Sequence, residues 1–545
     1  MLTTFTAPAF AKTWYIEDGD ITISASETKG TNKVSQGAEP EVEDTGTIIT
    51  NREKDASSHT VTINAGNDKV EVTLDNVNIK ADSGSALISK GDVTLTLKGD
   101  NHLTGGNGGS SSYGGDGITS SGSLTISGGT VTATGGDSTS SVGSGGSGIY
   151  SVSGDVTISG GTVNANGGDG KNGSGGGSGI DSSGGVTVSG GTVTANGGDS
   201  KDGDGGSGGY GISSSGVAIS GGTVTANGGD GGSGSGSHGG NGIYSSGGVT
   251  ISSGSTVTAN GGDGEDGSGG RGITSNGGVT VSGGTVNAKG GSGKNGNGGD
   301  GIRSFNPVAI SGGTVNANGG NSDYSNGGDG IRSLDHVAIS GGTVKSNGGS
   351  GNLSGGNGII SYDIDLSGSL ELTAKAGSPN GKALSRVGSE LDLNTIKDKL
   401  DPGAKVTATD ADGKVIQQVS IPRPVEPEEP SSSSDSGSAT SSAPASPLPG
   451  LTVTDKDGQR ISYTSTQSGN TLTVCVGRFT ASLRISLAAL RQLRAEGIET
   501  ITFQTILCST TLSVDELLAM GGEDAEVVLT HHIRSSTLTV GGRAV

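Results

Sequence analysis

Aspartates recur in the glycine-rich stretches of this 545-residue chain at intervals near 30 residues. Carboxylate oxygens are the ligands that hard cations such as Ca²⁺ prefer, and a repeat would stack them at similar heights on successive units. The pattern therefore predicts a calcium cofactor, and the competing interpretation is a set of solvated acidic loop tips. The candidate metal ligands are Asp169, Asp199, Asp230, Asp263, Asp266, Asp300 and Asp329.

A second group of side chains gathers around a recurring Gly-Ile step and the loop before it. Sugar recognition combines an aromatic platform with polar groups that reach hydroxyls, and both kinds occur here. The hypothesis is a carbohydrate-binding surface, and the alternative is a set of scattered surface tyrosines. The candidates are Tyr150, Asp181, Tyr210, Tyr244, Arg303, Phe305 and Arg332.

Catalysis has weaker support than binding. A polysaccharide lyase needs clustered acidic metal ligands beside a basic residue, and Arg303 and Arg332 do share one repeat position after Ile302 and Ile331. A glycoside hydrolase needs carboxylates at fixed short separation, which the sequence does not present. We therefore expect no catalytic residue, with a lyase of the pectate type as the minority alternative.

The elements that position these residues follow from a repeat. Eight variants of V-T-I-S-G-G-T-V-T-A-N-G-G lie between residues 124 and 347. Alternation of apolar and small polar residues indicates short strands with one buried face, and a constant period indicates a solenoid. One unit predicts three strands and a glycine-rich loop, stacked ~4.8 Å apart as a right-handed parallel β-helix of about 30 residues per coil. The recurring valines are Val131, Val163, Val193, Val224, Val257, Val286, Val315 and Val344.

Two further features of the repeat have structural interpretations. Gly160-Gly161 and Gly167-Gly168 are expected at corners, where glycine tolerates positive φ. The asparagines that end each unit are expected to form a structural ladder at a corner. Paired T-x-T residues on the third strand leave ice binding as a minor alternative, since threonine is also an ordinary strand surface residue.

Composition divides the rest of the chain. Residues 1–11 end in Ala9-Phe10-Ala11 and predict the remnant of a signal peptide. Residues 12–105 predict an N-terminal cap and first coils, 106–375 the regular coils, and 376–421 a C-terminal cap. A Pro/Ser-rich linker follows at 422–450, and a small α+β domain at 451–545.

The last domain carries its own local signals. Ser486 can cap a helix that Gly497 ends, and Ser513-x-x-Glu516 forms a capping box. Cys475 and Cys508 are the only cysteines of the chain, and the alternatives are a disulfide between them or two buried thiols.

The net charge of −21 disfavours nucleic acid and anionic membrane surfaces as partners, because both attract basic patches. No apolar stretch approaches 20 residues, so we expect no membrane span. Export to the medium or the cell surface fits this composition. The oligomeric state stays open.

The segments around Trp14-Tyr15-Ile16, Val72–Val77 and Gly91–Leu95, followed by Leu124–Gly129, resemble a family of bacterial carbohydrate-binding-domain proteins. These are secreted right-handed parallel β-helices, and the resemblance covers about residues 12–375. It implies non-catalytic binding or adhesion to polysaccharide or cell-surface glycan, with calcium on the solenoid. A purely structural surface spacer is the remaining alternative. No L-P-x-T-G sorting signal is present, which puts covalent attachment to the cell wall in doubt.

Overall fold

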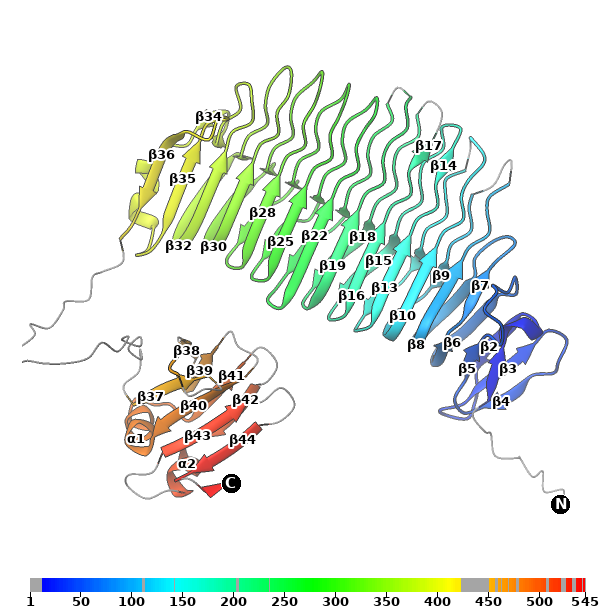
Figure 1. Ribbon diagram of the computed structural model, residues 1–545, viewed down its shortest axis with the longest axis horizontal. Helices are drawn as coiled ribbons and strands as arrows, with labels where there is room; N and C mark the ends of the chain where they lie inside the picture. Colours follow the sequence, from blue (N-terminus) through cyan, green and yellow to red (C-terminus); the bar gives the residue numbers. More distant parts are fainter. Residues whose placement is uncertain are drawn as a thin grey trace, which may run out of the picture. The chain divides into compact units, whose positions relative to one another are not determined.

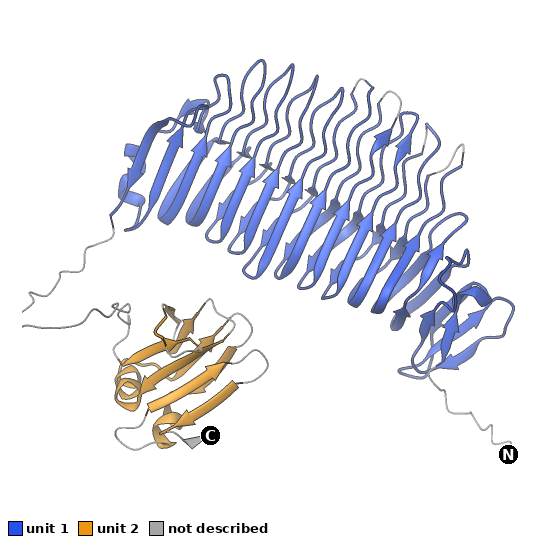
Figure 2. Ribbon diagram, viewed as in Figure 1, with its two compact units in different colours: residues 1–426 blue, residues 427–545 orange. Residues whose placement is uncertain are grey.

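The computed structural model describes residues 12–422 except 110–112, 142, 202–204 and 235, and residues 450–544 except 456–458, 462, 469, 477–479, 506–508, 521–525, 532–535 and 542. It divides into two compact units, Met1–Glu426 and Pro427–Val545 (Figure 2). The predicted signal-peptide remnant and all but residues 422 and 450 of the predicted linker lie outside the described residues.

The first unit is a parallel β-helix, as the repeat predicts (Figure 1). Strands of successive coils pair in parallel and in register, so that Val163 lies beside Val193 and Val193 beside Val224. Each coil contributes to three sheets. Face 1 contains the strand after the Gly-Ile step, face 2 the V-T-I strand, and face 3 the T-V-T-A-N strand.

The strands of face 1 are β2 (Ile21–Ala25), β9 (Ile118–Ser121), β11 (Ile149–Ser153), β20 (Ile243–Ser245), β23 (Ile273–Ser275), β26 (Ile302–Ser304), β29 (Ile331–Ser333), β31 (Ile359–Ser361) and β33 (Leu384–Arg386). Those of face 2 are β5 (Ile48–Thr50), β12 (Val156–Ile158), β21 (Val249–Ile251), β24 (Val279–Val281) and β27 (Val308–Ile310). Those of face 3 are β7 (Asn78–Lys80), β13 (Thr162–Asn166), β16 (Thr192–Asn196), β19 (Gly222–Asn227), β22 (Ser255–Asn260), β25 (Thr285–Lys289), β28 (Thr314–Asn318) and β35 (Lys405–Thr409).

Several strands bend around a corner without a break. β6 (Val61–Asp75), β15 (Ile180–Val188) and β18 (Ile212–Ile219) pass from face 1 to face 2. β10 (Leu124–Thr134), β30 (His336–Asn347) and β32 (Asp363–Lys375) pass from face 2 to face 3, and β8 (Leu87–Thr104) crosses all three. In the loops, β14 (Gly170–Lys171) pairs with β17 (Ser200–Lys201).

The core is the stack of inward side chains that the alternation predicts. The isoleucine that opens each face 1 strand is fully buried from Ile118 to Ile359, and so is the face 3 valine from Val131 to Val344. Because each coil buries its apolar side chains only against neighbouring coils, no unit is stable alone. The outward residues are thereby held at one spacing along the whole stack.

Both ends of the stack are covered. At the N-terminal end lie β1 (Thr13–Tyr15), the 3₁₀ helix η1 (Ile16–Asp18), β3 (Asn32–Gln36) and β4 (Val42–Asp44). Trp14 is buried there and donates its indole N–H to Asp44 Oδ2 at 2.7 Å. At the C-terminal end β34 (Ser389–Glu390), the 3₁₀ helix η2 (Leu393–Lys399) and β36 (Val415–Ser420) close the last coils.

The glycine-rich loops have a structure that the sequence did not reveal. In each coil an outgoing and a returning arm pack so closely that their backbones hydrogen-bond alternately from coil to coil. Gly209 N–H donates to Gly198 O at 2.8 Å, Gly229 N–H to Gly209 O at 2.9 Å, and Gly240 N–H to Gly229 O at 2.8 Å. A Cβ on Gly229 would lie 2.0 Å from Gly198 O, so no side chain fits there.

This packing corrects one expectation about the glycines. Gly161 does take positive φ, at +79°, as a corner residue should. Gly167 and Gly168 do not have positive φ; they are arm residues, and a Cβ on either would lie within 2.1 Å of a backbone carbonyl of a neighbouring arm. Close approach of backbones, rather than left-handed conformation, is the reason for glycine at these positions.

The asparagine ladder forms, but within face 3 rather than at a left-handed corner. Asn196 Nδ2 donates to Asn166 Oδ1 at 2.9 Å, Asn227 Nδ2 to Asn196 Oδ1 at 2.8 Å, and Asn260 Nδ2 to Asn227 Oδ1 at 2.9 Å. Lys289 then interrupts the row. The amide side chains thus bond to one another, and the structural interpretation of the ladder is confirmed.

The second unit is a small α+β domain. One sheet contains β37 (Leu451–Thr454), β40 (Ala481–Ser486), β43 (Glu526–His531), β44 (Ser536–Val540) and β45 (Arg543–Ala544); the other contains β38 (Thr464–Ser468), β39 (Thr471–Cys475), β41 (Thr500–Gln504) and β42 (Ser509–Ser513). The helices are α1 (Leu487–Ala495) and α2 (Val514–Met520). Ser486 caps α1 as predicted, accepting from Ala489 N–H at 3.2 Å.

Candidate functional site

Two outward rows run side by side along face 1. One row is the residue that follows each buried isoleucine, and the parallel register places Tyr244, Thr274, Arg303 and Arg332 next to one another in that order. The other row is the residue before each Gly-Ile step, where the returning glycine arm meets the sheet. Its members are Asp116, Ser147, Ser178, Tyr210, Asn241, Arg271, Asp300, Asp329 and Asn357.

An aromatic pair occupies the middle of these rows. Tyr210 and Tyr244 come from adjacent coils, and their rings stack with centroids 5.4 Å apart and planes 17° from parallel. Burial, with a smaller contribution from Tyr244, raises the pKa of Tyr210. Tyr210 is still 37% exposed, and the pair therefore presents an aromatic surface to solvent.

Three arginines follow the tyrosines on consecutive coils. Arg271 Nε lies 3.5 Å from Asp300 Oδ2, Arg303 NH1 lies 3.7 Å from the same oxygen, and Arg332 NH1 lies 3.1 Å from Asp329 Oδ2. The two aspartate side chains are 8% and 6% exposed, whereas those of Arg271, Arg303 and Arg332 are 36%, 22% and 37% exposed. The carboxylates thus lie beneath the guanidinium groups and orient them toward solvent.

We call the outward surface made by Tyr210, Tyr244, Arg271, Arg303 and Arg332 the face 1 strip. Phe305 lies at its edge, 45% exposed, with the Arg303 Cζ atom 5.2 Å from its ring centroid. The Nε atoms of Arg303 and Arg332 are buried and have no hydrogen-bond partner among the described residues. On a chain of net charge −21, this strip is a local concentration of oriented cations.

Asp300 and Asp329 are both buried and adjacent, and their charges interact. Burial first, and then repulsion from Asp300, raises the pKa of Asp329 from 3.8 to about 6. Each carboxylate also accepts a hydrogen bond from a backbone amide: Asp329 N–H donates to Asp300 Oδ1 at 2.9 Å, and Asn357 N–H donates to Asp329 Oδ1 at 2.6 Å. Their first role in the fold is therefore to cap amides of the next coil.

The raised pKa makes stability depend on pH. Between the pKa of the unfolded chain, near 3.8, and about 6, the folded state holds a proton on Asp329 that the unfolded state has lost. Stability therefore falls as pH rises through this window, by about 3 kcal/mol at pH 7. Asp329→Asn keeps the amide cap, as Asn241 does in its own coil. We expect this variant to melt as wild type does at pH 4 and at a higher temperature at pH 7, in calorimetric scans.

The comparison at pH 4 serves as the control for the Asp329→Asn substitution, because the protonated carboxyl and the amide are nearly isosteric. A variant with the same pH profile as wild type, or one that melts lower at pH 7, would contradict the electrostatic account of this pair.

The N-terminal part of the rows has a different character. Tyr150 lies beside Asp181 in the register. Burial raises the pKa of Asp181, and burial also raises that of Asp116, which accepts from Thr119 Oγ1 at 2.7 Å and from Ser147 N–H at 2.8 Å. This end of face 1 is acidic, whereas the face 1 strip is aromatic and basic. Asp181 still lies close enough to the strip for its charge to help raise the pKa of Tyr210.

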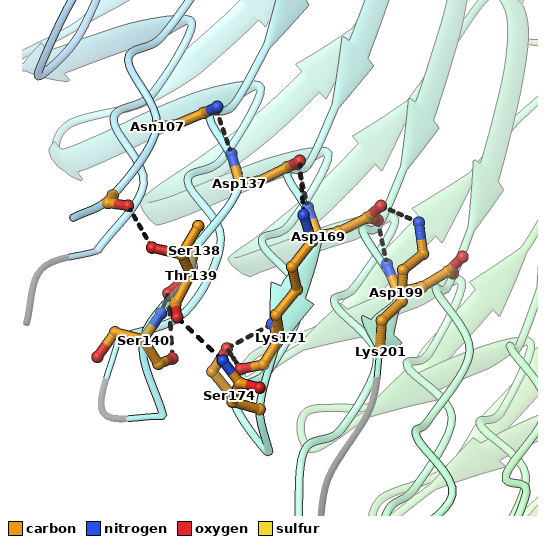
Figure 3. Close-up of polar contacts among 12 residues, drawn as sticks. Asn107, Asp137, Ser138, Thr139, Ser140, Asp169, Lys171, Ser174, Asp199 and Lys201 are labelled. Carbon is orange, nitrogen blue, oxygen red and sulfur yellow. Dashed lines mark hydrogen bonds and ion pairs between the residues drawn. The ribbon is translucent and has the colours of Figure 1, made fainter. Parts of the chain in front are cut away.

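The aspartates in the loops form a ladder of their own (Figure 3). Asp137 N–H donates to Asn107 Oδ1, and the N–H groups of Asp169 and Asp199 each donate to the carboxylate of the preceding coil, all at 3.0 Å. The series continues with Asp230 N–H at 2.9 Å, Asp263 N–H at 2.7 Å and Ser292 N–H at 2.6 Å from the carboxylate before them. One oxygen of each carboxylate therefore accepts a hydrogen bond from the backbone.

Lysines take part in the same ladder. Lys171 Nζ lies 3.9 Å from Asp137 Oδ2, and Lys201 Nζ is paired with Asp169 Oδ2. Asp266 lies nearer the loop tip and accepts from Asn295 Nδ2 at 2.7 Å. A hollow of about 310 Å³ beside Asp230, Asp263, Glu265 and Asp323 also contains Lys294. Within the described ranges, no three His, Cys, Asp or Glu side chains are grouped as metal ligands. The arrangement fits amide caps better than a calcium site, and calcium stays a prediction.

Sequence reasoning missed Arg271, Thr274 and Asp116. Thr274 is 3% exposed between its register neighbours Tyr244 and Arg303, and its Oγ1 has no hydrogen-bond partner in the described part of the chain. The available signal was the variable residue in the repeated G-G-x-G-I pattern, which is Arg271 in one coil and Tyr210 in another.

Of the two cysteines, only Cys475 is among the described residues. Cys475 ends β39 and is partly exposed, with its Sγ 3.6 Å from Gln504 Oε1. Cys475 is a free thiol here, so neither the predicted disulfide nor a buried thiol is found at this position; Cys508 lies outside the described residues. In the regions described, no helix has the length and apolar character needed to span a bilayer.

The Beta helix repeat family matches four stretches of the solenoid, at residues 124–148, 156–178, 217–241 and 308–331. No curated protein and no solved structure matches the chain. Each matched stretch ends at or next to the Gly-Ile step, and the four together contain Ser147, Ser178, Asn241 and Asp329 of the second row of face 1. Repeat matches and coil geometry agree that the chain is a parallel β-helix protein.

Proposed function

We propose that the protein binds polysaccharide along the face 1 strip without cleaving it, outside the cell or at its surface. One observation carries the proposal: a stacked tyrosine pair continues directly into three arginines held outward by buried aspartates. Aromatic rings offer a surface for the apolar side of a sugar ring, and guanidinium groups donate to hydroxyl and carboxylate oxygens.

The spacing of the strip also suits a chain-like ligand. Parallel coils repeat the same outward positions every ~4.8 Å, so successive side chains can contact successive sugar units along one direction. The preorganisation matters for affinity, because side chains that are already ordered lose little entropy on binding. Arg303 is held by Asp300 on one side and lies over Phe305 on the other.

A polysaccharide lyase is the second candidate, favoured by the presence of buried carboxylates next to Arg303 and Arg332. Against it, Asp300 and Asp329 lie beneath the arginines and each accepts a hydrogen bond from a backbone amide. A lyase would use such carboxylates to hold a metal ion beside the basic residue, and here each carboxylate already bonds to a backbone amide and pairs with an arginine. Binding without cleavage therefore has the better support.

Retention on insoluble polysaccharides, with and without a chelator, tests the proposal. We expect the full chain to be retained by at least one polysaccharide. Retention that is lost when a chelator is present would show that binding depends on calcium. Failure to bind any polysaccharide would leave a structural spacer as the better interpretation. A rise in ultraviolet absorbance from unsaturated products on pectate would instead establish the lyase.

A further inference from the structure

The face 1 strip ends in a hollow of about 270 Å³ near the C-terminal cap. Its lining residues are Arg332, Ser333, Leu334, Ile360, Ser361, Tyr362, Val387 and Gly388. This volume is below the ~300–1,000 Å³ typical of sites for drug-sized ligands, so it has room for about one sugar unit. The hollow is therefore a place for a single residue of a longer ligand or for its end.

Apolar side chains form most of the wall. Ile360 follows Arg332 in the outward row of face 1, and Leu334 and Val387 lie on corner positions of neighbouring coils. Tyr362 and Val387 are 66% and 68% exposed, which is unusual for large apolar residues on one small surface. They contribute little to the core, because so much of each side chain is in solvent.

Val387 is also strained. Its φ of +49° is in the left-handed region, which a β-branched residue rarely adopts and which the adjacent Gly388 adopts without cost. Val387 and Gly388 form the two-residue turn of the hairpin between β33 and β34, and such a turn takes positive φ at both residues. The turn places the isopropyl group of Val387 at the rim of the hollow.

The guanidinium group of Arg332 lies on the other side of the rim. Arg332 is held by Asp329 at 3.1 Å and leads from the strip into the hollow. Apolar walls of this size accept a methyl or acyl group, and a guanidinium pairs with a carboxylate. A sugar that carries both an anionic group and an acyl group matches both surfaces.

We propose that this hollow binds a sugar that carries both a carboxylate and an N-acyl group, as one residue of the polysaccharide on the face 1 strip. The inference rests on the proposed function and names the chemistry of one unit of its ligand. Charge complementarity at Arg332 and continuity with the strip select this occupant.

Four monosaccharides test the requirement for a carboxylate and the requirement for an N-acyl group separately. N-acetylneuraminate has both groups, galacturonate only the carboxylate, N-acetylglucosamine only the acetyl group, and glucose neither. In saturation-transfer NMR with the full chain, we expect N-acetylneuraminate to bind about tenfold or more tightly than the other three, with strongest transfer to its acetyl methyl. Equal binding of galacturonate or N-acetylglucosamine would overturn the double requirement, and so would equal binding of glucose.

The decisive variant is Val387→Gly, which relieves backbone strain while it removes the apolar rim. We expect it to weaken N-acetylneuraminate binding about tenfold without lowering the temperature of thermal unfolding, and Tyr362→Ser to weaken binding equally with unchanged thermal unfolding. Thr225→Asn with Thr258→Asn on face 3 is the matched control, because Asn287 and Asn316 occupy that row naturally. If the polysaccharide is retained but none of the four sugars binds, only the proposal for the hollow is refuted. If no polysaccharide is retained, the proposed function is refuted as well.

Discussion

Gly229→Ala is expected to destabilise the solenoid by more than about 3 kcal/mol, although it adds a single methyl group. The new Cβ would lie 2.0 Å from Gly198 O, and backbone cannot yield as a flexible side chain can. Gly229 also donates to Gly209 O and accepts from Gly240 N–H, so the strain spreads to both arms. Thermal unfolding followed by circular dichroism measures the loss, and hydrogen exchange locates it.

Gly160→Ala is the matched control for this experiment. Among the described residues, no atom lies within 4 Å of a Cβ added to Gly160, and Gly160 does not adopt positive φ, so alanine should be neutral or slightly stabilising. The returning arm that Gly240 begins leads directly to Tyr244, so opening it should also disturb the face 1 strip. A Gly229→Ala protein as stable as Gly160→Ala would show that the arms are not close-packed.

The sequence was sufficient to predict the coil, because its information is local and repeated. Alternation around Val156–Ile158 specifies which side chains point inward, and the constant period specifies which residues stack. The start of α1 in the second unit could also be predicted from the sequence, because the cap that Ser486 forms depends only on residues within one turn.

The glycine arms and aspartate ladders could not be assigned in this way. Whether Gly168 is a corner or a contact depends on how near the neighbouring arm lies, and composition carries no distance. For the loop aspartates a signal was present but unused: Asn107 and Asn321 stand in the same ladder and make the same cap, and asparagine supplies no charge to a cation. Arg271 was missed although it occupies the variable position of the same G-G-x-G-I pattern as Tyr210, two coils further along the row.

The tyrosine pair should carry much of the binding affinity. Aromatic residues near the centre of a contact surface often account for about 2 kcal/mol each or more, which corresponds to about a 30-fold change in affinity. Tyr210→Ser with Tyr244→Ser introduces the residue found at the same row positions in adjacent coils, Ser178 and Ser213, so the coil should fold as before. We expect at least a 30-fold weaker association with the retained polysaccharide, measured by titration calorimetry.

The measurement that tests the central claim most directly is this titration on three proteins side by side. Wild type and the face 3 control Thr225→Asn/Thr258→Asn should bind the polysaccharide equally, whereas Tyr210→Ser/Tyr244→Ser should lose at least 30-fold in affinity with unchanged thermal unfolding. Equal binding by all three proteins, or a loss on face 3 alone, would contradict the assignment of binding to the face 1 strip.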